Sequence, residues 1–221
     1  MVFVRLHMTP SPLSFETSMP ARDALEEFRR RRIRHAPVLE RGALLGIVTE
    51  RDLVRVLPGT VADYEGAQGL RASRTTVAMA MTKNPICVSP NDHIDDVARL
   101  LRDKKISAVP VVSDSKLVGI LTSSDLFDAF EAMFSGQPGK RFTLLRPPGA
   151  NYNPGFDLVR CAVDLGIELH SLVRAGHSRG GEVLTVYVEG DVDRLEEFRT
   201  RAEDNGYVLL EKDDRRLKRP A

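Results

Sequence analysis

The chain has 221 residues, a formal net charge of +1 and 42% hydrophobic residues, which is enough apolar content for folded cores. The near-neutral charge argues against binding to nucleic acid or to a membrane surface, and no apolar run approaches the length of a membrane span. The two cysteines lack metal-ligand spacing and favour a reducing compartment, and the N-terminus is too short and too interrupted for a secretory leader. We therefore predict a cytoplasmic protein.

One pattern occurs twice, because residues 8–53 return as residues 81–126 at a constant offset of 73 residues. No insertion interrupts the match and 14 of its 46 positions are identical, which indicates two copies of one structural unit. Apolar spacing and turn residues predict the order helix, strand, strand, helix in each copy. The predicted strands are 36–39, 43–48, 108–112 and 116–121, and the helices that follow them are 52–57 and 125–134.

An amphipathic helix is predicted ahead of the strands in each copy. Its apolar face consists of Ala21, Ala24, Leu25 and Phe28 in the first copy, and of Ile94, Val97, Ala98 and Leu101 in the second. Polar residues just before these faces are candidate helix caps. They are Ser18, followed by Pro20 in the first turn, and Asn91 or Asp92.

The rest of the chain has a different pattern. Residues 59–76 are predicted to connect the copies, with a short helical turn near Tyr64, and residues 136–140 to form a linker. Residues 141–212 predict the order βαββαβ of a ferredoxin-like unit, ahead of a charged tail at 213–221. Its predicted strands are 141–146, 167–174, 182–189 and 207–211. Its first helix is 156–165, stopped by Gly166. Its second helix is capped by Asp191 and ended by Gly206, and the residues expected to face inward are Val192, Leu195, Phe198 and Ala202.

The sequence Gly-x-x-Thr-x-x-Asp ends the second strand of both copies, as Gly46 to Asp52 and as Gly119 to Asp125. A threonine and an acid at this spacing can form a capping box that satisfies free N–H groups at a helix start. The same helix start suits a phosphate, while the carboxylate can accept hydrogen bonds from both ribose hydroxyls. Spacing alone does not separate these interpretations, but recurrence at one register favours a binding site.

Three motifs in each copy resemble the cystathionine-β-synthase (CBS) domain. They are Met8-Thr-Pro-Ser-Pro12, Ile33-Arg-His-Ala-Pro-Val38 and Gly46-Ile-Val-Thr-Glu-Arg-Asp52, and then Met81-Thr-Lys-Asn-Pro85, Ile106-Ser-Ala-Val-Pro-Val111 and Gly119-Ile-Leu-Thr-Ser-Ser-Asp125. The resemblance implies a tandem CBS pair, or Bateman module, with domains at 1–58 and 77–135. It implies an α/β (α+β) fold whose repeats pack by their sheets and leave two clefts for adenosine nucleotides or related ligands.

The resemblance also implies roles for individual positions. Asp52 and Asp125 are expected to hold the ribose hydroxyls, and Thr49 and Thr122 to face the ribose or a phosphate. The backbone of Ala36 and of Val109 is expected to read the adenine edge. Ile47 and Ile120 are expected to flank the base. Arg51 is the nearest candidate cation for a polyphosphate. No cofactor is required, and the expected ligand is AMP, ADP or ATP.

The two copies differ in charge beside the motif, with Glu50 and Arg51 in the first against Ser123 and Ser124 in the second. We therefore predict clefts of unequal affinity, with phosphate selectivity in the first. The basic run at 29–32, with Arg34 beyond it, is interpreted as favourable charge at a helix C-terminus rather than as a phosphate or nucleic-acid contact. A dimeric interaction module whose clefts are structural and bind no nucleotide stays open as the alternative.

The βαββαβ segment resembles the ACT domain, a small-molecule sensing module, through Asn153-Pro-Gly155-x-x-Leu158. Here asparagine, at position 151 or 153, stands where that family has an acid. Asn153 and Gly155 are thus candidate ligand contacts, with a purely dimerising domain as the equal alternative. A CBS pair followed by an ACT-like domain resembles the acetoin-utilisation regulatory (AcuB-like) proteins. This arrangement implies a non-enzymatic, homodimeric regulator whose protein partner is unknown.

Overall fold

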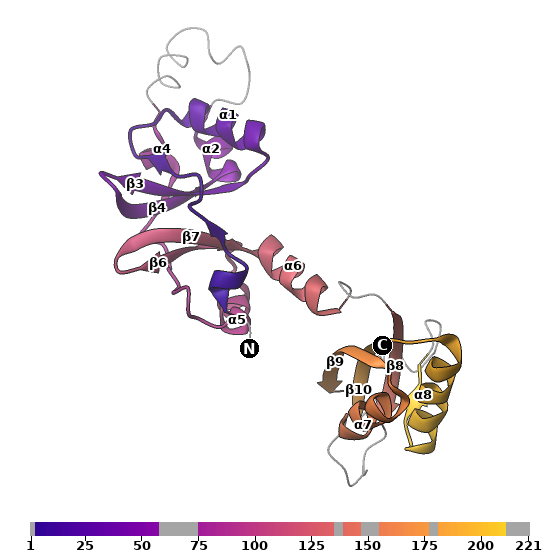
Figure 1. Cartoon of the computed structure of the whole chain (residues 1–221). Helices are drawn as coiled ribbons and strands as arrows, with labels where there is room; N and C mark the ends of the chain where they lie inside the picture. The colour runs from indigo at the N-terminus through magenta and orange to yellow at the C-terminus, as the bar shows by residue number, and fades with distance from the viewer. Residues whose placement is uncertain (1–2, 58–74, 135–138, 147–154, 177–180, 211–221) are drawn as a thin grey trace. The chain divides into compact units, whose positions relative to one another are not determined.

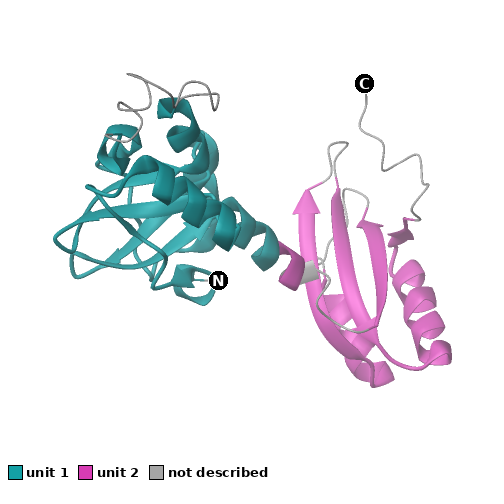
Figure 2. Ribbon diagram, turned by 90° about the horizontal axis from the view of Figure 1, so that it is seen from above, with its two compact units in different colours: residues 1–129 teal, residues 130–221 magenta. Residues whose placement is uncertain are grey.

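The computed structural model describes residues 3–57, 75–134, 139–146, 155–176 and 181–210. The chain divides into two compact units, Met1–Ala129 and Phe130–Ala221, which are coloured separately in Figure 2. No helix in the described part of the chain is both long and apolar enough to cross a membrane. The helical turn expected near Tyr64, the turn at 179–180 and the charged tail lie outside the described residues.

Both copies of the repeat have the predicted order of helix, strand, strand and helix (Figure 1). In the first copy these elements are α1 (Ala21–Arg31), β3 (His35–Glu40), β4 (Ala43–Thr49) and α2 (Glu50–Val56). In the second they are α5 (Ile94–Lys104), β6 (Ala108–Ser113), β7 (Lys116–Thr122) and α6 (Ser123–Phe134). Helices α2 and α6 begin two residues earlier than predicted, because the motif threonine itself precedes the first turn.

The predicted caps of α1 and α5 are wrong. Pro20 and His93 occupy the N-cap positions, and neither provides a side-chain cap. The Ala21 N–H instead donates to the backbone carbonyl of Thr75, at 2.9 Å. The Asp92 carboxylate accepts from the Ser89 N–H, at 2.8 Å. Backbone from a distant segment thus satisfies a helix start that a local side chain was expected to satisfy.

The start of each copy crosses into the other copy. Strand β1 (Thr9–Pro10) pairs with β7 of the second copy, and β5 (Thr82–Lys83) pairs with β4 of the first. The preceding turns, η1 (Val4–Leu6) and α4 (Val77–Ala80), cross in the same way. Val4 lies in the second copy's core and its equivalent Val77 lies in the first copy's core. Beyond the crossing each copy returns to its own sheet, because β2 (Phe15–Glu16) runs parallel to β3 and Val88 pairs in parallel with Val111 of β6.

The glycine of each Gly-x-x-Thr-x-x-Asp motif makes room for this crossing. A Cβ on Gly46 would lie 2.7 Å from the Met81 sulfur, and one on Gly119 would lie 2.6 Å from the Met8 sulfur. Both distances are far below van der Waals contact, so any larger residue requires the crossing segment to move. The paired Met-Thr motifs and the paired glycines are therefore parts of one packing arrangement.

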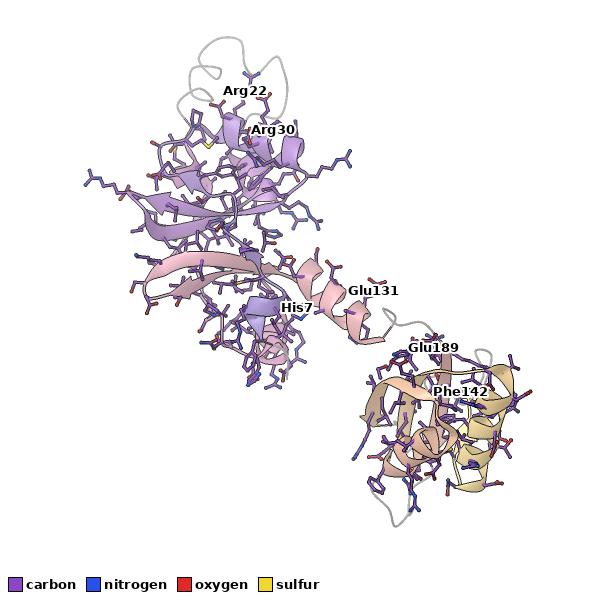
Figure 3. All side chains as sticks on the ribbon, in the orientation of Figure 1. His7, Arg22, Arg30, Glu131, Phe142 and Glu189 are labelled. Atoms are coloured by element: carbon purple, nitrogen blue, oxygen red, sulfur yellow. The ribbon has the colours of Figure 1, made fainter. Side chains whose placement is uncertain are left out.

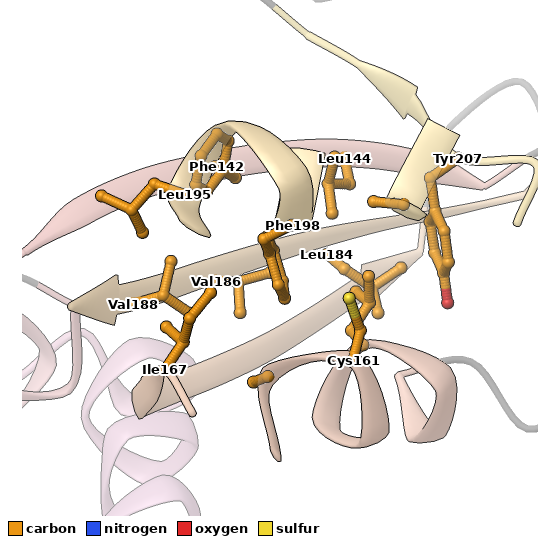
Figure 4. Packing of buried hydrophobic residues seen from close by; sticks show 13 residues of the cluster. Phe142, Leu144, Cys161, Ile167, Leu184, Val186, Val188, Leu195, Phe198 and Tyr207 are labelled. Atoms are coloured by element: carbon orange, nitrogen blue, oxygen red, sulfur yellow. The ribbon is translucent and has the colours of Figure 1, made fainter. Parts of the chain in front are cut away.

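The second unit contains the predicted βαββαβ order: β8 (Lys140–Arg146), α7 (Phe156–Leu165), β9 (Glu168–Gly176), β10 (Glu182–Glu189), α8 (Val192–Asp204) and β11 (Val208–Leu209). Its antiparallel sheet has the order β11-β8-β10-β9, and both helices contribute to the core in Figure 4. The cap at Asp191 and the left-handed stop at Gly166 are confirmed. Val192, predicted to face inward, is 75% exposed, and the buried face of α8 begins at Leu195.

Candidate functional site

The threonine and aspartate of each motif form a capping box at the start of a helix. In the first copy the Thr49 N–H and hydroxyl donate to Asp52 Oδ2 at 3.0 and 2.6 Å, and the Asp52 N–H donates to the Thr49 hydroxyl at 3.2 Å. In the second copy the same three bonds join Thr122 and Asp125 at 2.7, 2.8 and 3.4 Å. The motif therefore has a structural role in both copies.

The capping box uses only half of each carboxylate. Every bond accepted by Asp52 and Asp125 goes to Oδ2, and Oδ1 accepts no hydrogen bond from the described residues. Both aspartates are partly buried and line cavities. One oxygen is thus fixed in position by the helix start while the other remains available to a ligand donor.

Two clefts contain these aspartates, and each is built from both copies. The Asp125 cleft is a cavity of about 640 Å³ that joins the second copy's motif to Thr9 and to residues 33–35 of the first copy. The Asp52 cleft, of about 310 Å³, joins the first copy's motif to Thr82 and to residues 106–108 of the second. Both volumes fall in the range usual for small-ligand sites. The crossing of β1 and β5 contributes Thr9 and Thr82 to this mixed composition.

Most of the predicted nucleotide-binding positions line these clefts. Ile47, Thr49 and Asp52 line the Asp52 cleft, and Ile120, Thr122 and Asp125 line the Asp125 cleft. Ala36 and Val109 were expected to read the adenine edge, but both are 0% exposed, belong to the two hydrophobic cores and line neither cleft.

Residues that the sequence interpretation did not include line the clefts in their place. They are chiefly Thr9, Ile33 and His35 on one side, and Thr82, Ile106 and Ala108 on the other. The repeated Met-Thr and Ile residues were visible in the sequence. Their pairing with the motif of the opposite copy was not, because no local pattern states which sheet a short strand joins.

Arg51, the predicted phosphate cation, lies outside both clefts. It lines a separate hollow of about 600 Å³ together with Thr49, Glu50, Val54 and three residues near the start of β3 and β6. Its neighbour Glu50 carries the opposite charge in the same hollow. Thr49 lines both the hollow and the Asp52 cleft, so Arg51 lies next to that cleft without being part of it.

His35 and Ser107 form the wall shared by the two clefts. The His35 Nε2 and the Ser107 hydroxyl lie 2.7 Å apart, and both residues line the Asp125 cleft, the Asp52 cleft and the Arg51 hollow. Burial lowers the pKa of His35, the neighbouring Arg34 lowers it further, and Asp52 opposes the shift. The contact between His35 and Ser107 links β3 to the residue just before β6.

The basic run at the end of α1, where Figure 3 labels Arg30, has two different surroundings. Arg30 and Arg31 both donate to the Glu27 carboxylate, and these bonds lower the pKa of Glu27 to about 2. Arg31, Arg32 and Arg34 line the Asp125 cleft. The sequence interpretation, favourable charge paired with glutamate at the helix end, describes the first surroundings and misses the second.

In the second unit, the junction between β8 and α7 is held by Tyr207. Its hydroxyl donates to Asp157 at 2.7 Å and accepts from the Gly155 N–H and from Arg146, each at 3.2 Å. Burial, and then the bond to Asp157, raise the pKa of Tyr207 to about 12. Gly155 has a left-handed φ of +98° at the start of α7, and Asn153 lies outside the described residues.

Glu168, His170 and Glu189 form a further group of side chains whose spacing could accommodate a metal ion. The two carboxylates approach opposite ring nitrogens, since Glu168 lies 3.7 Å from Nδ1 and Glu189 lies 3.0 Å from Nε2. An ion held by both carboxylates and one ring nitrogen would require these side chains to rearrange. The geometry favours a hydrogen-bonded cluster on β9 and β10.

The family model of the CBS domain matches residues 4–59 and 77–132, which together make up about half of the chain. Among curated relatives, an uncharacterized protein of Methanocaldococcus jannaschii, MJ1225, is 28% identical over 123 residues. That match covers 55% of this chain and 40% of MJ1225. The chain thus spans less than half of the length of this relative, and 22% of the L-aspartate semialdehyde sulfurtransferase of the same organism.

Three solved structures are similar to the first unit. Arabidopsis thaliana CBSX2 in complex with AMP has 30% identity and a TM-score of 0.50, covering 59% of this chain and 96% of its own. The CBS pair of protein MJ0100, in complex with 5′-methylthioadenosine and S-adenosyl-L-methionine, has 26% identity and a TM-score of 0.50, covering 60% and 98%. A Vibrio cholerae protein assigned to acetoin utilization (AcuB) has 27% identity and a TM-score of 0.51, covering 62% and 99%.

Proposed function

Because this chain belongs to the CBS-domain family, we propose that it is a non-enzymatic regulatory sensor whose clefts bind an adenine nucleotide of the AMP, ADP or ATP type. Similar CBS pairs hold AMP in one case and methylthioadenosine with S-adenosylmethionine in another. Adenosine is common to all these ligands. The proposal is therefore that the clefts recognise the adenosine portion of a ligand, whichever phosphate or sulfonium group that ligand carries.

The observation that carries the proposal is the half-used carboxylate in each cleft. Asp52 and Asp125 each have one oxygen fixed by a capping box and one that accepts nothing from the described residues. An ionised carboxylate in a cleft gains from a donor, and adjacent ribose hydroxyls supply two. Partly buried isoleucines line the same clefts, Ile47 and Ile106 beside Asp52 and Ile33 beside Asp125, and offer apolar surface to a base.

The competing function is an interaction module with structural clefts. Its support is the completeness of the two capping boxes, since these explain the repeated Thr-x-x-Asp without any ligand. On this alternative, substitution of the aspartates would change the stability of the unit and would leave every small-molecule titration flat.

Isothermal titration calorimetry with adenosine, AMP, ADP, ATP and S-adenosylmethionine tests the proposal. Asp52→Asn and Asp125→Asn change the charge and hydrogen bonding of the ribose acceptor with little change in size, and the double variant should lose binding by about tenfold or more. Asp191→Asn is the matched control, because Asp191 caps α8 in the second unit and lines none of the cavities described above. Absence of heat from the wild-type chain with all five compounds would refute the proposal.

We propose that the second unit is an ACT-like domain for a second small ligand or for dimerisation. A Cβ on Gly155 would lie 3.2 Å from two side-chain atoms of Leu172, so this glycine is already required by local packing. Support for a ligand contact therefore depends on a titration with amino acids. Support for pairing comes from β9, an edge strand of nine residues in its own sheet.

We also propose that the chain is a homodimer. Equivalent positions on α2 and α6 are occupied by Val54 and Phe127, which are 51% and 73% exposed. Large apolar side chains exposed at the same place in both copies are a common feature of protein–protein interfaces. Sedimentation velocity on the full chain measures the oligomeric state directly.

A further inference from the structure

We propose that the Asp125 cleft is the polyphosphate site and that the Asp52 cleft prefers a ligand with fewer phosphates. The inference rests on the proposed function and assigns a ligand class to each cleft. It also reverses the prediction from sequence, which placed phosphate selectivity in the first copy beside Arg51.

The charges that line the two clefts carry the inference. Arg31, Arg32 and Arg34 line the Asp125 cleft, in which Asp125 is the only carboxylate among the described lining residues. In the Asp52 cleft the corresponding count is one cation, Lys105, and one carboxylate. Each phosphate group adds negative charge to a ligand, so the Asp125 cleft favours a polyphosphate more than the Asp52 cleft does.

The imbalance comes from particular replacements at equivalent positions. Arg32 and Lys105 occupy the same left-handed position, with φ of 55° and 54°, directly after α1 and α5. Two residues further on, Arg34 is replaced by Ser107. The guanidinium group is always charged and can donate two parallel hydrogen bonds to one phosphate, which a lysine or a serine cannot do.

The arginines of this cleft differ in whether a carboxylate of the protein already pairs with them. Arg31 donates to Glu27 at 2.9 Å. Arg32 and Arg34 form no ion pair with any residue that the structure describes, and both are exposed. The nearby C-terminus of α1 carries a partial negative charge, which stabilises these cations without neutralising them.

The start of α6, a helix of twelve residues, also lines the Asp125 cleft. The Ser123 N–H donates to the Ser107 carbonyl and the Asp125 N–H donates to Thr122. The Ser124 N–H makes no hydrogen bond within the described residues. An anion in this cleft would thus have both the arginines and a partly open helix N-terminus among its surroundings.

The strongest competing place for phosphate is the Arg51 hollow, which adjoins Asp52. Its charged residues are Arg34, Arg51 and Glu50. Glu50 opposes an anion there, whereas the equivalent position in the second copy is the neutral Ser123. This comparison favours the Asp125 cleft, and substitution of Arg51 tests the competing site.

Calorimetric titration of adenosine and ATP into the full chain tests the inference. Arg31 and Arg32 line only the Asp125 cleft among the three cavities, so R31Q/R32Q should weaken ATP about tenfold and leave adenosine unchanged. K104Q/K105Q is the matched control at the equivalent positions and should change ATP binding by less than about threefold, as should R51Q. Added salt should weaken ATP binding to the wild type more than to R31Q/R32Q.

Two results with the variants would overturn the inference. One is loss of ATP affinity in R51Q or K104Q/K105Q instead of R31Q/R32Q, and the other is an equal loss of adenosine and ATP affinity in R31Q/R32Q. Wild-type chain that binds adenosine and ATP equally well would refute the inference and leave the proposed function intact. Wild-type chain that binds no adenine compound would refute the proposed function itself.

Discussion

The crossing of the two N-terminal segments can be tested with a single pair of substitutions, Val4→Ala and Val77→Ala. Each valine is completely buried, Val4 in the second copy's core and Val77 in the first copy's core. Each change removes two methyl groups, which costs about 1.6 kcal/mol in transfer free energy, and the cavity left behind raises the total to about 2–3 kcal/mol.

Hydrogen exchange of backbone amides shows where this stability is lost. A local loss of about 2 kcal/mol accelerates exchange about thirtyfold in the amides that depend on the affected core. For Val77→Ala we expect this in β3 and β4, and for Val4→Ala in β6 and β7. Val163→Ala is the control, since that valine is 72% exposed on α7 and its truncation should change exchange little.

The reasoning would be refuted if Val4→Ala accelerated exchange in β3 and β4 and left β6 and β7 unchanged. That is the outcome expected if residue 4 belonged to the copy in which it lies in sequence. Equal acceleration of both sheets in both variants would refute the assignment of separate cores, because the two copies would then unfold as one unit.

Three further outcomes are expected. Gly46→Ala or Gly119→Ala should lower the free energy of unfolding of the first unit by about 1–3 kcal/mol, because the new Cβ would meet a methionine sulfur within 3 Å. A melting temperature that calorimetry finds unchanged would contradict this close approach. The combined Val54→Ser and Phe127→Ser variant should sediment as a monomer if these side chains form the dimer contact, and an intact dimer would exclude that surface. Because the folded state raises the pKa of Tyr207 from 10 to about 12, the neutral phenol is favoured there, and the second unit should lose stability as the pH rises from 10 through 12. Tyr207→Phe should remove that pH dependence, and a pH profile identical to the wild type would show that another group causes it.

The elements themselves could be predicted from sequence wherever a local pattern specifies them. The strand pairs, helix α7, strand β10, the cap at Asp191 and the stop at Gly166 all depend on neighbours within a few residues. The caps of α1 and α5 could not, because the Ala21 N–H is satisfied by Thr75, more than fifty positions along the chain. Short elements such as β1 and β5 were missed for a similar reason, since two residues form a strand only against a partner.

The candidate site shows the same division. The repeat identified the motif threonines and aspartates, because a polar residue fixed at one register in two copies needs more than packing to explain it, and the CBS resemblance added the isoleucines. The role expected for the backbone of Ala36 and Val109 at the adenine edge stays a prediction, and both are core residues whose neighbours His35 and Ala108 line the clefts. Burial of a particular side chain depends on which elements cover it, and that is not a local property.

Sequence by itself determined that this chain contains two copies of one unit, a third unit of different pattern and a pair of aspartates at helix starts. Tertiary structure alone decided which residues face each aspartate. Short strands at the start of each copy pair with the opposite sheet, residues at the end of α1 line the Asp125 cleft, and Lys105 just after α5 lines the Asp52 cleft. The arginines of the first copy therefore line the cleft of the second copy's motif, because backbone pairing between segments distant in sequence, rather than proximity along the chain, sets the electrostatics of a site.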